Sequence, residues 1–330
     1  MRVLLTGGSG YLGSILARKL LKKGYDVRIL DNFLFGKNSI NEIQKNKKLE
    51  TVQGDIRDLS VVSKSLKDID SVIHLASIVG VQASELDPKT SIEINYLSTR
   101  NIADLCKLYE IKQFVYASTC SVYGAQPNKL ISENSEVNPL DSYGQSKFES
   151  EKAILQAYDY PTILRLGTLF GASYRMRFDL AINLFIARAM NKEKLTVFGG
   201  NQWRPFLHVD DAAEAFSFVV DKQMEGIYNV IWKNLAIKTA AQNISKLIPS
   251  KIEFSKDIVD KRDYRVSGSK FEKFGFRAKK DIKYAVKEFK NKIKNEVKNY
   301  KLEKYSNYKS FFHSKILQKK VYTQGSIFKN

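Results

Sequence analysis

The sequence contains few cysteines and histidines and no long apolar segment. Its two cysteines, Cys106 and Cys120, are too few for a disulfide framework in a 330-residue chain, so we expect reduced thiols and a cytoplasmic location. The three histidines show no zinc-ligand spacing with the cysteines, which predicts no metal site. No run approaches the roughly 18 apolar residues of a membrane-spanning helix. A strand-like run from residue 2 leaves no room for a signal peptide.

Acidic residues are scarce relative to basic ones, 35 against 54, which gives a formal net charge of +19. Residues 281–330 concentrate this excess, with 13 Lys and 4 Asp or Glu. Such a segment could contact nucleic acid, an anionic membrane surface or an acidic partner. We favour a general lysine-rich composition instead, because the charges are spread along the chain and no nucleic-acid motif accompanies them. We therefore predict no nucleic-acid partner, and peripheral membrane contact is the less favoured alternative.

Strand and helix patterns alternate through the first half of the chain. Short apolar runs predict strands at 2–5, 27–30, 49–52, 72–75, 114–117 and 161–166. Helical patterns lie between them at about 11–23, 59–67, 90–109 and 143–158. This alternation predicts parallel strands joined by right-handed crossovers, and therefore an α/β fold with a Rossmann-type doubly wound parallel sheet. After about residue 167 the pattern loosens into a smaller mixed α/β region.

A glycine-rich turn, residues 6–13 (TGGSGYLG), directly follows the first predicted strand. Glycines allow the backbone to approach a pyrophosphate closely, and the helix that follows offers its free N–H groups to the phosphates. Asp31 closes the second predicted strand, where its carboxylate can accept hydrogen bonds from ribose hydroxyls and disfavours a 2′-phosphate. Together these features predict an NAD site. The alternative is a turn that serves only tight strand–helix packing.

Tyr143 and Lys147 are four residues apart and share one face of a predicted helix. A nearby ammonium favours the phenolate, which would make Tyr143 a general acid/base near neutral pH. Thr119 follows the strand at 114–117, at the sheet edge where ligands of doubly wound folds bind. Its hydroxyl could contact the same substrate oxygen as Tyr143. Taken alone, a Tyr and a Lys at this spacing would be only a pair on a helix surface.

The ordered combination of these motifs resembles the extended short-chain dehydrogenase/reductase family of nucleotide-sugar epimerases and dehydratases. The matching segments are residues 6–13, 31–32, 54–58 (GDIRD), 74–77 (HLAS), 118–124 (STCSVYG), 143–147 (YGQSK), 165–171 (RLGTLFG), 204–211 (RPFLHVDD) and 263–267 (DYRVS). The resemblance implies an NAD-binding domain at 1–167, to which 206–231 returns. It also implies a nucleotide-sugar-binding lobe at 168–205 and 232–295. Residues 296–330 form a basic C-terminal tail to which we assign no role.

The resemblance also implies individual roles. The catalytic group would be Thr119, Tyr143 and Lys147. The cofactor would contact Gly7, Gly10, Tyr11, Leu12, Gly13, Asp31, Asn32, Asp55, Ile56, Leu75, Ala76, Ser77, Tyr143 and Lys147. A nucleotide-diphosphate sugar would contact Thr119, Thr168, Asn183, Leu184, Thr196, Phe198, Arg204 and Arg262. We also expect a homodimer that pairs through helices at about 95–108 and 143–158, as the family commonly does.

One departure from the family pattern narrows the reaction. Cys120 and Ser121 stand where the family's 4,6-dehydratases place an acid pair, so elimination of water would lack its acid and base. We therefore predict a C4 epimerase, in which NAD transiently oxidises the sugar to a 4-keto form and returns the hydride to the opposite face. The main alternative is a nucleotide-keto-sugar reductase or dehydrogenase, and a 4,6-dehydratase is less favoured. The remote alternative is a non-catalytic, NAD-responsive binding protein.

Overall fold

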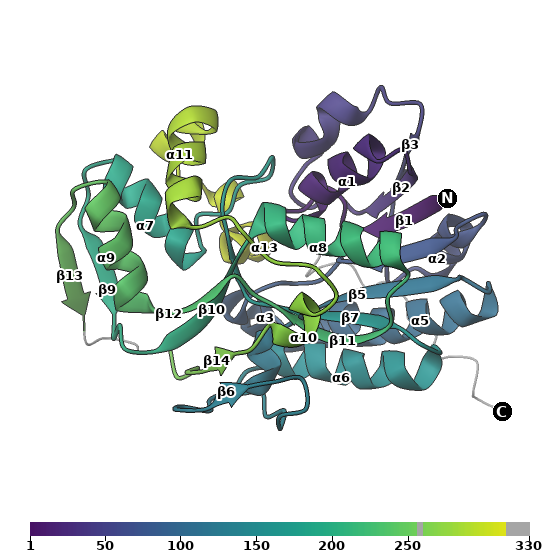
Figure 1. The fold of residues 1–330 in the computed structure, drawn as a ribbon. Coiled ribbons are helices and arrows are strands. Elements are labelled where there is room, and N and C mark those ends of the chain that lie inside the picture. The colour runs from purple at the N-terminus through teal and green to yellow at the C-terminus, as the bar shows by residue number, and fades with distance from the viewer. Residues whose placement is uncertain (256–259, 315–330) are drawn as a thin grey trace.

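The computed structural model describes residues 1–255 and 260–314, which form an α/β architecture around one central sheet (Figure 1). The sheet has seven parallel strands in the order β11-β7-β5-β4-β1-β2-β3. The strands are β1 (Arg2–Thr6), β2 (Asp26–Asp31), β3 (Leu49–Gln53), β4 (Ser71–His74), β5 (Gln113–Thr119), β7 (Thr162–Leu166) and β11 (Gly226–Val230). This confirms the predicted Rossmann-type parallel sheet. The strand order reverses beside β1, and ligands of such sheets bind beyond the carboxyl ends of the strands there.

Helices cover both faces of this sheet, so its inner strands are buried on both sides, whereas the edge strand β3 is largely exposed. In Figure 1, α1 (Gly13–Lys22) and α8 (Val209–Lys222) lie on one face, while α5 (Ser98–Leu108) and α6 (Ser142–Ala157) lie on the other. Alternate residues of β1 follow this division. Leu5 packs with α1 and α8, and Leu4 packs with the opposite helices. The remaining elements of this half are η1 (Asn38–Ile43), α2 (Leu59–Leu66), α3 (Val81–Leu86), α4 (Pro88–Ile92), η2 (Glu93–Leu97) and η3 (Cys120–Tyr123).

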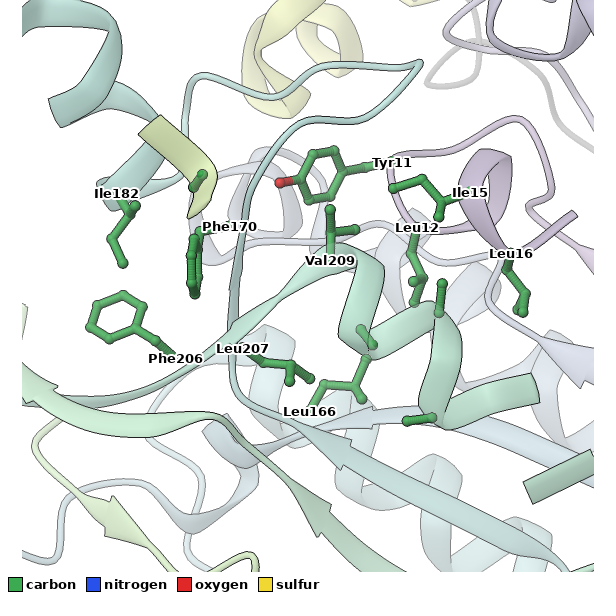
Figure 2. Packing of buried hydrophobic residues seen from close by; sticks show 14 of the residues in the cluster. Tyr11, Leu12, Ile15, Leu16, Leu166, Phe170, Ile182, Phe206, Leu207 and Val209 are labelled. Carbon is green, nitrogen blue, oxygen red and sulfur yellow. The ribbon is translucent and has the colours of Figure 1, made fainter. Parts of the chain in front are cut away.

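A smaller lobe continues from the carboxyl end of β7. Its strands are β8 (Thr168–Phe170), β10 (Trp203–His208) and β12 (Lys233–Ala236) in one sheet, with the pairs β9 (Leu195–Phe198) and β13 (Ile252–Ser255), and β6 (Leu130–Ile131) and β14 (Arg265–Val266). Helices α7 (Ala181–Met190) and α9 (Ile237–Leu247) accompany them, whereas α10 (Ser269–Glu272) packs against β11 of the central sheet. Figure 2 shows how the lobe joins the glycine-rich loop: Tyr11 and Leu12 point toward side chains of β8, β10 and the start of α8. This packing fixes the lobe next to the loop.

The C-terminal segment is more ordered than the sequence pattern indicates. It contains α11 (Ile282–Lys292), α12 (Lys294–Lys298), η4 (Glu303–Tyr305) and α13 (Asn307–Phe312). Phe311 is only 2% exposed and belongs to the core on the α5–α6 side of the sheet. The amide of Phe178 donates to the carbonyl oxygen of Tyr305 at 2.9 Å, so the segment also holds the loop that follows β8. The rest of the predicted tail, residues 315–330, lies outside the described residues.

Candidate active site

The glycine-rich loop has a shape that only glycine permits at two positions. Gly7 adopts φ +73°, and a Cβ at this position would lie 2.8 Å from the amide nitrogen of Ala76. A Cβ on Gly13 would collide with the carbonyl oxygen of Gly7, so α1 could not start so close to β1. The loop, including Gly10, Tyr11 and Leu12, therefore leaves bare backbone at the start of a helix. Such a cradle fits the diphosphate of a dinucleotide.

Asp31 ties this loop to the end of β2. Its Oδ2 accepts from the amide of Ser9 at 2.9 Å, and its Oδ1 accepts from the amide of Phe33 at 2.8 Å. Burial raises the pKa of this carboxyl, and the two backbone donors oppose that effect. The neighbouring Asn32 accepts from the amide of Leu34 at 3.0 Å and shapes the same turn. Asp31 thus fixes the loop, in addition to the ribose contact predicted for it.

The end of β4 lies next to the glycine-rich loop, with which it shares backbone contacts. Thr6 Oγ1 accepts from the amides of Leu75 and Ala76, both at 3.2 Å, and lies 2.7 Å from His74 Nδ1. Since the other ring nitrogen of His74 lies 2.9 Å from Thr99 Oγ1, both nitrogens are used. Burial, followed by the charge of Lys147, lowers the pKa of His74 to about 3, so the ring is neutral. A neutral histidine at the end of β4 therefore links β1 to α5.

Three further predicted cofactor positions follow strands of the central sheet: Asp55 and Ile56 lie after β3, and Ser77 lies after β4. Asp55 forms a two-point ion pair with Arg57, with Nε–Oδ1 at 3.1 Å and Nη2–Oδ2 at 2.8 Å. Ile56 is buried, at 6% exposure. Ser77 donates to Asn95 Oδ1 at 2.8 Å. Their cofactor roles remain predictions.

The three predicted catalytic residues converge at the carboxyl end of β5. Tyr143 stands in the first turn of α6, which Asp141 caps by accepting from the amide of Gly144 at 2.8 Å. Thr119 ends β5, and its hydroxyl lies near enough to the phenol of Tyr143 to lower the pKa of that phenol. Tyr143 is 9% exposed and Lys147 is 3% exposed. The phenol is therefore held inside the molecule beside a second hydroxyl, as a proton relay requires.

The electrostatics of Tyr143 differ from the expectation that Lys147 lowers its pKa. Burial raises the pKa of Tyr143 to about 12, and the cations that oppose this are Arg177 and Arg262. Burial also lowers the pKa of Lys147 to about 7, against the attraction of Glu151. The protein alone therefore leaves the phenol protonated at neutral pH. Full activation requires further positive charge beside it.

Lys147 is held among groups that do not neutralise it. Its Nζ lies 4.3 Å from the centroid of the Tyr116 ring. One turn further along α6, Glu151 is engaged by Arg165 instead, with Nη2–Oε2 at 2.6 Å. Within residues 1–255 and 260–314 no carboxylate forms an ion pair with Lys147. Its ammonium is therefore free to donate to a bound ligand, such as the ribose of the cofactor.

Two predicted substrate arginines meet on one carboxylate. Arg204 Nη2 lies 2.8 Å from Asp260 Oδ2, and Arg262 binds the same group through Nε at 2.9 Å and Nη2 at 2.6 Å. These two cations, Arg262 above all, hold the pKa of Asp260 far below its usual range despite its burial. Arg262 Nη1 also reaches Ser121 Oγ at 3.4 Å. The arrangement is an anion site that is occupied by a carboxylate of the protein itself.

The other predicted substrate residues differ in their exposure and in whether the protein already binds their polar atoms. Asn183 is fully buried, and its amide is engaged by the protein: Oδ1 accepts from Gly171 N at 2.8 Å, and Nδ2 donates to Arg177 O at 2.8 Å. Thr168, Leu184 and Thr196 are half-buried in β8, α7 and β9, and Phe198 is 46% exposed at the end of β9. Their substrate contacts remain predictions.

Some residues of the site were not predicted from the sequence. Arg177 lies in the loop after β8 and forms a two-point ion pair with Asp179, with Nε–Oδ1 at 2.9 Å and Nη2–Oδ2 at 3.0 Å. Asn95 lies in the π-helical turn η2, where its amide bonds Ser77 and Ile78 and its carbonyl accepts from Ser150 of α6 at 2.7 Å. A π-turn has no distinctive residue spacing that would reveal it, although such turns are frequent at functional sites.

Cys120 and Ser121 stand where the family's 4,6-dehydratases place an acid pair, and the structure shows the surroundings of both side chains. Cys120 is 1% exposed, and its Sγ contacts the carbonyl oxygen of Arg165, so it faces the interior. Burial raises the pKa of this thiol above its ordinary range. Ser121 Oγ lies 3.4 Å from the hydroxyl of Tyr264. Neither position supplies a carboxylate beside Tyr143.

Comparison with known proteins agrees with this geometry. Residues 3–230 match the NAD dependent epimerase/dehydratase family. The chain belongs to that family. NAD is therefore its cofactor, and the resemblance drawn from the motifs is confirmed.

Named relatives extend the likeness over most of the chain. A putative UDP-glucose 4-epimerase from Methanocaldococcus jannaschii is 33% identical over 316 residues, covering 89% of this chain and 98% of the relative. The UDP-glucuronic acid 4-epimerase of Bacillus cereus, solved with UDP-glucuronic acid and NAD, is 26% identical with a TM-score of 0.80, covering 91% of this chain and 100% of that one. The NAD complex of Thermus thermophilus UDP-glucose 4-epimerase is 26% identical with a TM-score of 0.77, covering 89% and 100%.

Two further findings concern membrane-spanning helices and metal ligands. Among the residues that the structure describes, no helix is long and apolar enough to cross a membrane. In the same residues, no group of three or more His, Cys, Asp or Glu side chains is placed to hold a metal ion.

Proposed function

We propose that the protein is a nucleotide-sugar C4 epimerase. The observation that carries this is the buried Tyr143 phenol, which lies beside the Thr119 hydroxyl at the carboxyl end of β5 and is followed by a buried Lys147 with no carboxylate partner among the described residues. The similarity to a putative UDP-glucose 4-epimerase of Methanocaldococcus jannaschii and to the UDP-glucuronic acid 4-epimerase of Bacillus cereus supports the assignment. NAD, when bound, supplies the hydride acceptor and donor for the C4 carbon.

The chain's own residues move the proton. Tyr143 would act as the phenolate, which the positive charge of bound NAD favours: its Oη would accept the proton of the C4 hydroxyl and return it after the sugar has turned, while the Thr119 hydroxyl orients the same oxygen. Lys147 would donate to the ribose of bound NAD, since no carboxylate of the described residues occupies its ammonium. Gly7 and Gly13 would hold the cofactor's diphosphate at the start of α1. The reaction involves no net redox change, so a tightly held cofactor suffices.

The substrate's diphosphate would be held by Arg204 and Arg262. Their guanidinium groups suit phosphate oxygens in charge and in fork geometry. In this structure they converge on Asp260, which a diphosphate would replace. Rotation of the 4-keto sugar about its diphosphate linkage then needs no movement of the nucleotide. The absence of a carboxylate at Cys120 and Ser121 disfavours dehydration.

The assembly and the domain division are part of the proposal. The expected dimer helices, α5 and α6, are adjacent and share an outer groove lined by charged side chains such as Arg100, Asp104 and Glu149. Ile94 and Ile102 of the first helical region are buried in the core, so the interface would use the outer surface of these helices. We propose a cytoplasmic homodimer with an NAD-binding domain at 1–167 and 206–231, and a substrate lobe at 168–205 and 232–295.

A panel of UDP-, dTDP-, CDP- and GDP-hexoses tests the function. We expect the purified protein to convert at least one of them to its C4 epimer without net change of absorbance at 340 nm. A net absorbance change would favour the reductase or dehydrogenase. Tyr143→Phe should lower kcat by about 10² to 10⁴, whereas the exposed control Tyr160→Phe should match wild type. A Tyr143→Phe variant as fast as wild type would exclude this mechanism.

A further inference from the structure

One buried cation in the loop after β8 has hydrogen-bond donors that the protein does not use. Arg175 is 6% exposed, yet its Nε and Nη2 have no hydrogen-bond partner. Its Nη1 donates to Asn307 Oδ1 at 2.6 Å. Within residues 1–255 and 260–314 it forms no ion pair with a carboxylate. Because burying an unpaired charge is costly, such a group points to a ligand that completes it.

The surroundings of Arg175 are those of the cofactor loop. The centre of its guanidinium lies 3.7 Å from the ring of Phe35, in the turn that follows Asp31. The preceding Ser173 donates to the carbonyl oxygen of Tyr11 at 2.6 Å, and its Oγ lies 3.2 Å from Ser14 Oγ in α1. Residues 173–175 therefore lie against both the glycine-rich turn and the loop after β2. These are the two segments that border a dinucleotide in this fold.

The unused donors have the right form for a phosphate. Nε–H and Nη2–H lie on one edge of a planar guanidinium and can bind two oxygens side by side. Stacking on Phe35 and the bond to Asn307 fix the plane, so little freedom is lost on binding. Burial, and next the nearby Arg177, lower the pKa of Arg175 to about 9, which leaves it charged at neutral pH. An anion beside it would remove the burial cost.

We propose that Arg175 binds the diphosphate of NAD from the side opposite the start of α1. The glycine-rich loop and Arg175 would then enclose the diphosphate between backbone amides and a fixed cation. Asn307 of α13 acts as a positioning residue, because it holds Arg175 and also donates to the carbonyl oxygen of Val79 at 3.1 Å. This gives the C-terminal segment a role in cofactor binding. The inference holds whichever sugar is the substrate, so its failure would leave the proposed epimerase activity untouched.

Two diphosphates occur in the proposed reaction, and the contacts favour that of the cofactor. Arg175 belongs to the loop packed on Tyr11 and Phe35, whereas Arg204 and Arg262 meet on Asp260 in the lobe. The test therefore compares ligands that separate the sources. They are NAD and ADP for the cofactor's diphosphate, adenosine for its phosphate-free part, and UDP for the substrate side.

The experiment is calorimetric titration of nucleotide-free full-length protein. We expect Arg175→Met to weaken NAD and ADP binding by about ten- to a hundred-fold, to leave adenosine and UDP within about two-fold, and to leave the melting temperature of the ligand-free protein unchanged or raised. Arg175→Lys, which keeps the charge without the fork, should fall between. The matched control Arg265→Met removes an arginine that stacks on Trp203 and should bind NAD as wild type does.

Several outcomes would overturn the assignment. Unchanged ADP and NAD affinity in Arg175→Met would exclude a phosphate contact. An equal loss for adenosine would show a general distortion of the pocket. A loss for UDP alone would transfer the residue to the substrate. If Arg175→Met does not fold, Arg175→Lys decides between the same outcomes, since it must weaken ADP but not adenosine. Asn307→Ala should weaken ADP less than Arg175→Met does, and a larger loss would contradict its indirect role.

Discussion

Arg177 is the cation that most strongly lowers the pKa of the Tyr143 phenol, against the effect of burial. Lys147, which follows Tyr143 by four residues in α6, does not have this role. Burial raises the pKa of Tyr143 to about 12, and the largest effect in the other direction comes from Arg177. The two residues belong to different parts of the chain, one in the loop after β8 and the other in α6. The same loop carries Arg175. This loop therefore brings positive charge to the cofactor cradle and to the proton-transfer group together.

Removal of the Arg177 charge should shift the pH dependence of the reaction. Because Arg177 lowers the pKa of Tyr143, Arg177→Met should raise that pKa and move the acidic limb of kcat to higher pH by roughly one pH unit. Arg177→Lys keeps the charge and should move it less. Rate profiles from pH 5.5 to 9.5 check this. A limb at the same pH in Arg177→Met would show that Arg177 does not act on the phenol.

Asp260 should compete with the substrate's diphosphate. Since its carboxylate occupies both Arg204 and Arg262, Asp260→Asn should free their charge and lower the KM for the nucleotide sugar by about three- to ten-fold, with kcat nearly unchanged. The control is Asp159→Asn, which removes a surface carboxylate paired with Lys107. Steady-state kinetics distinguish the two variants. A raised KM in Asp260→Asn would mean that Asp260 positions the arginines for the substrate.

Lys147 should reduce the stability of the cofactor-free protein. Its pKa is about 7 in the folded chain against an ordinary 10.5, because burial disfavours its charge. Between these two pH values the unfolded chain binds more protons, so the free energy of unfolding of wild type should rise with pH by at most about 1.4 kcal/mol per pH unit. Lys147→Met should be inactive, more stable than wild type below pH 7, and should lack this rise.

Urea unfolding of the cofactor-free proteins at pH 6.5, 8 and 9.5 measures the difference. The stability advantage of Lys147→Met should shrink steadily across the series. An exposed control, Lys112→Met, should unfold in parallel with wild type, since its side chain is 77% exposed. Parallel curves for Lys147→Met as well would mean that Lys147 is not a buried cation.

The proposed dimer makes a prediction about the outer surface of α6. Leu155 is 51% exposed on this helix, and Leu108 is 74% exposed at the end of α5. Light scattering at micromolar concentration should give the mass of two chains for wild type. Leu155→Asp should shift the mass toward one chain, because it would bury a charge in the interface. Leu302→Asp, at another exposed leucine, should remain dimeric. A single-chain mass for wild type would refute the dimer.

The sequence allows prediction of the parts of the site that depend on local pattern. The turn at 6–13 needs glycine because backbone approaches backbone there, and the strand–helix alternation fixes which strand ends meet. Tyr143 and Thr119 could be combined because both lie at the carboxyl edge of one sheet. These features come from constraints on neighbouring residues or from parallel-sheet topology.

Other parts depend on contacts between distant segments. Arg175 and Asn307 are 132 positions apart, and nothing in the local sequence pairs them. Helices α12 and α13 contain only five and six residues, too few for an apolar period to be visible, so tertiary packing determines them. The sequence also could not show that burial dominates the pKa values of Tyr143 and Lys147, because a helical spacing of four predicts proximity but not burial.

The fate of a deuterium label at C4 distinguishes epimerisation from the alternative reactions. The substrate identified in the panel would be prepared with deuterium at C4 and converted in ordinary water. The account predicts a C4 epimer that retains the deuterium at C4, with no net change of absorbance at 340 nm. Deuterium found at C6 would indicate a dehydratase, and a lasting absorbance change with loss of the label from the sugar would indicate a dehydrogenase. Either result would contradict the account.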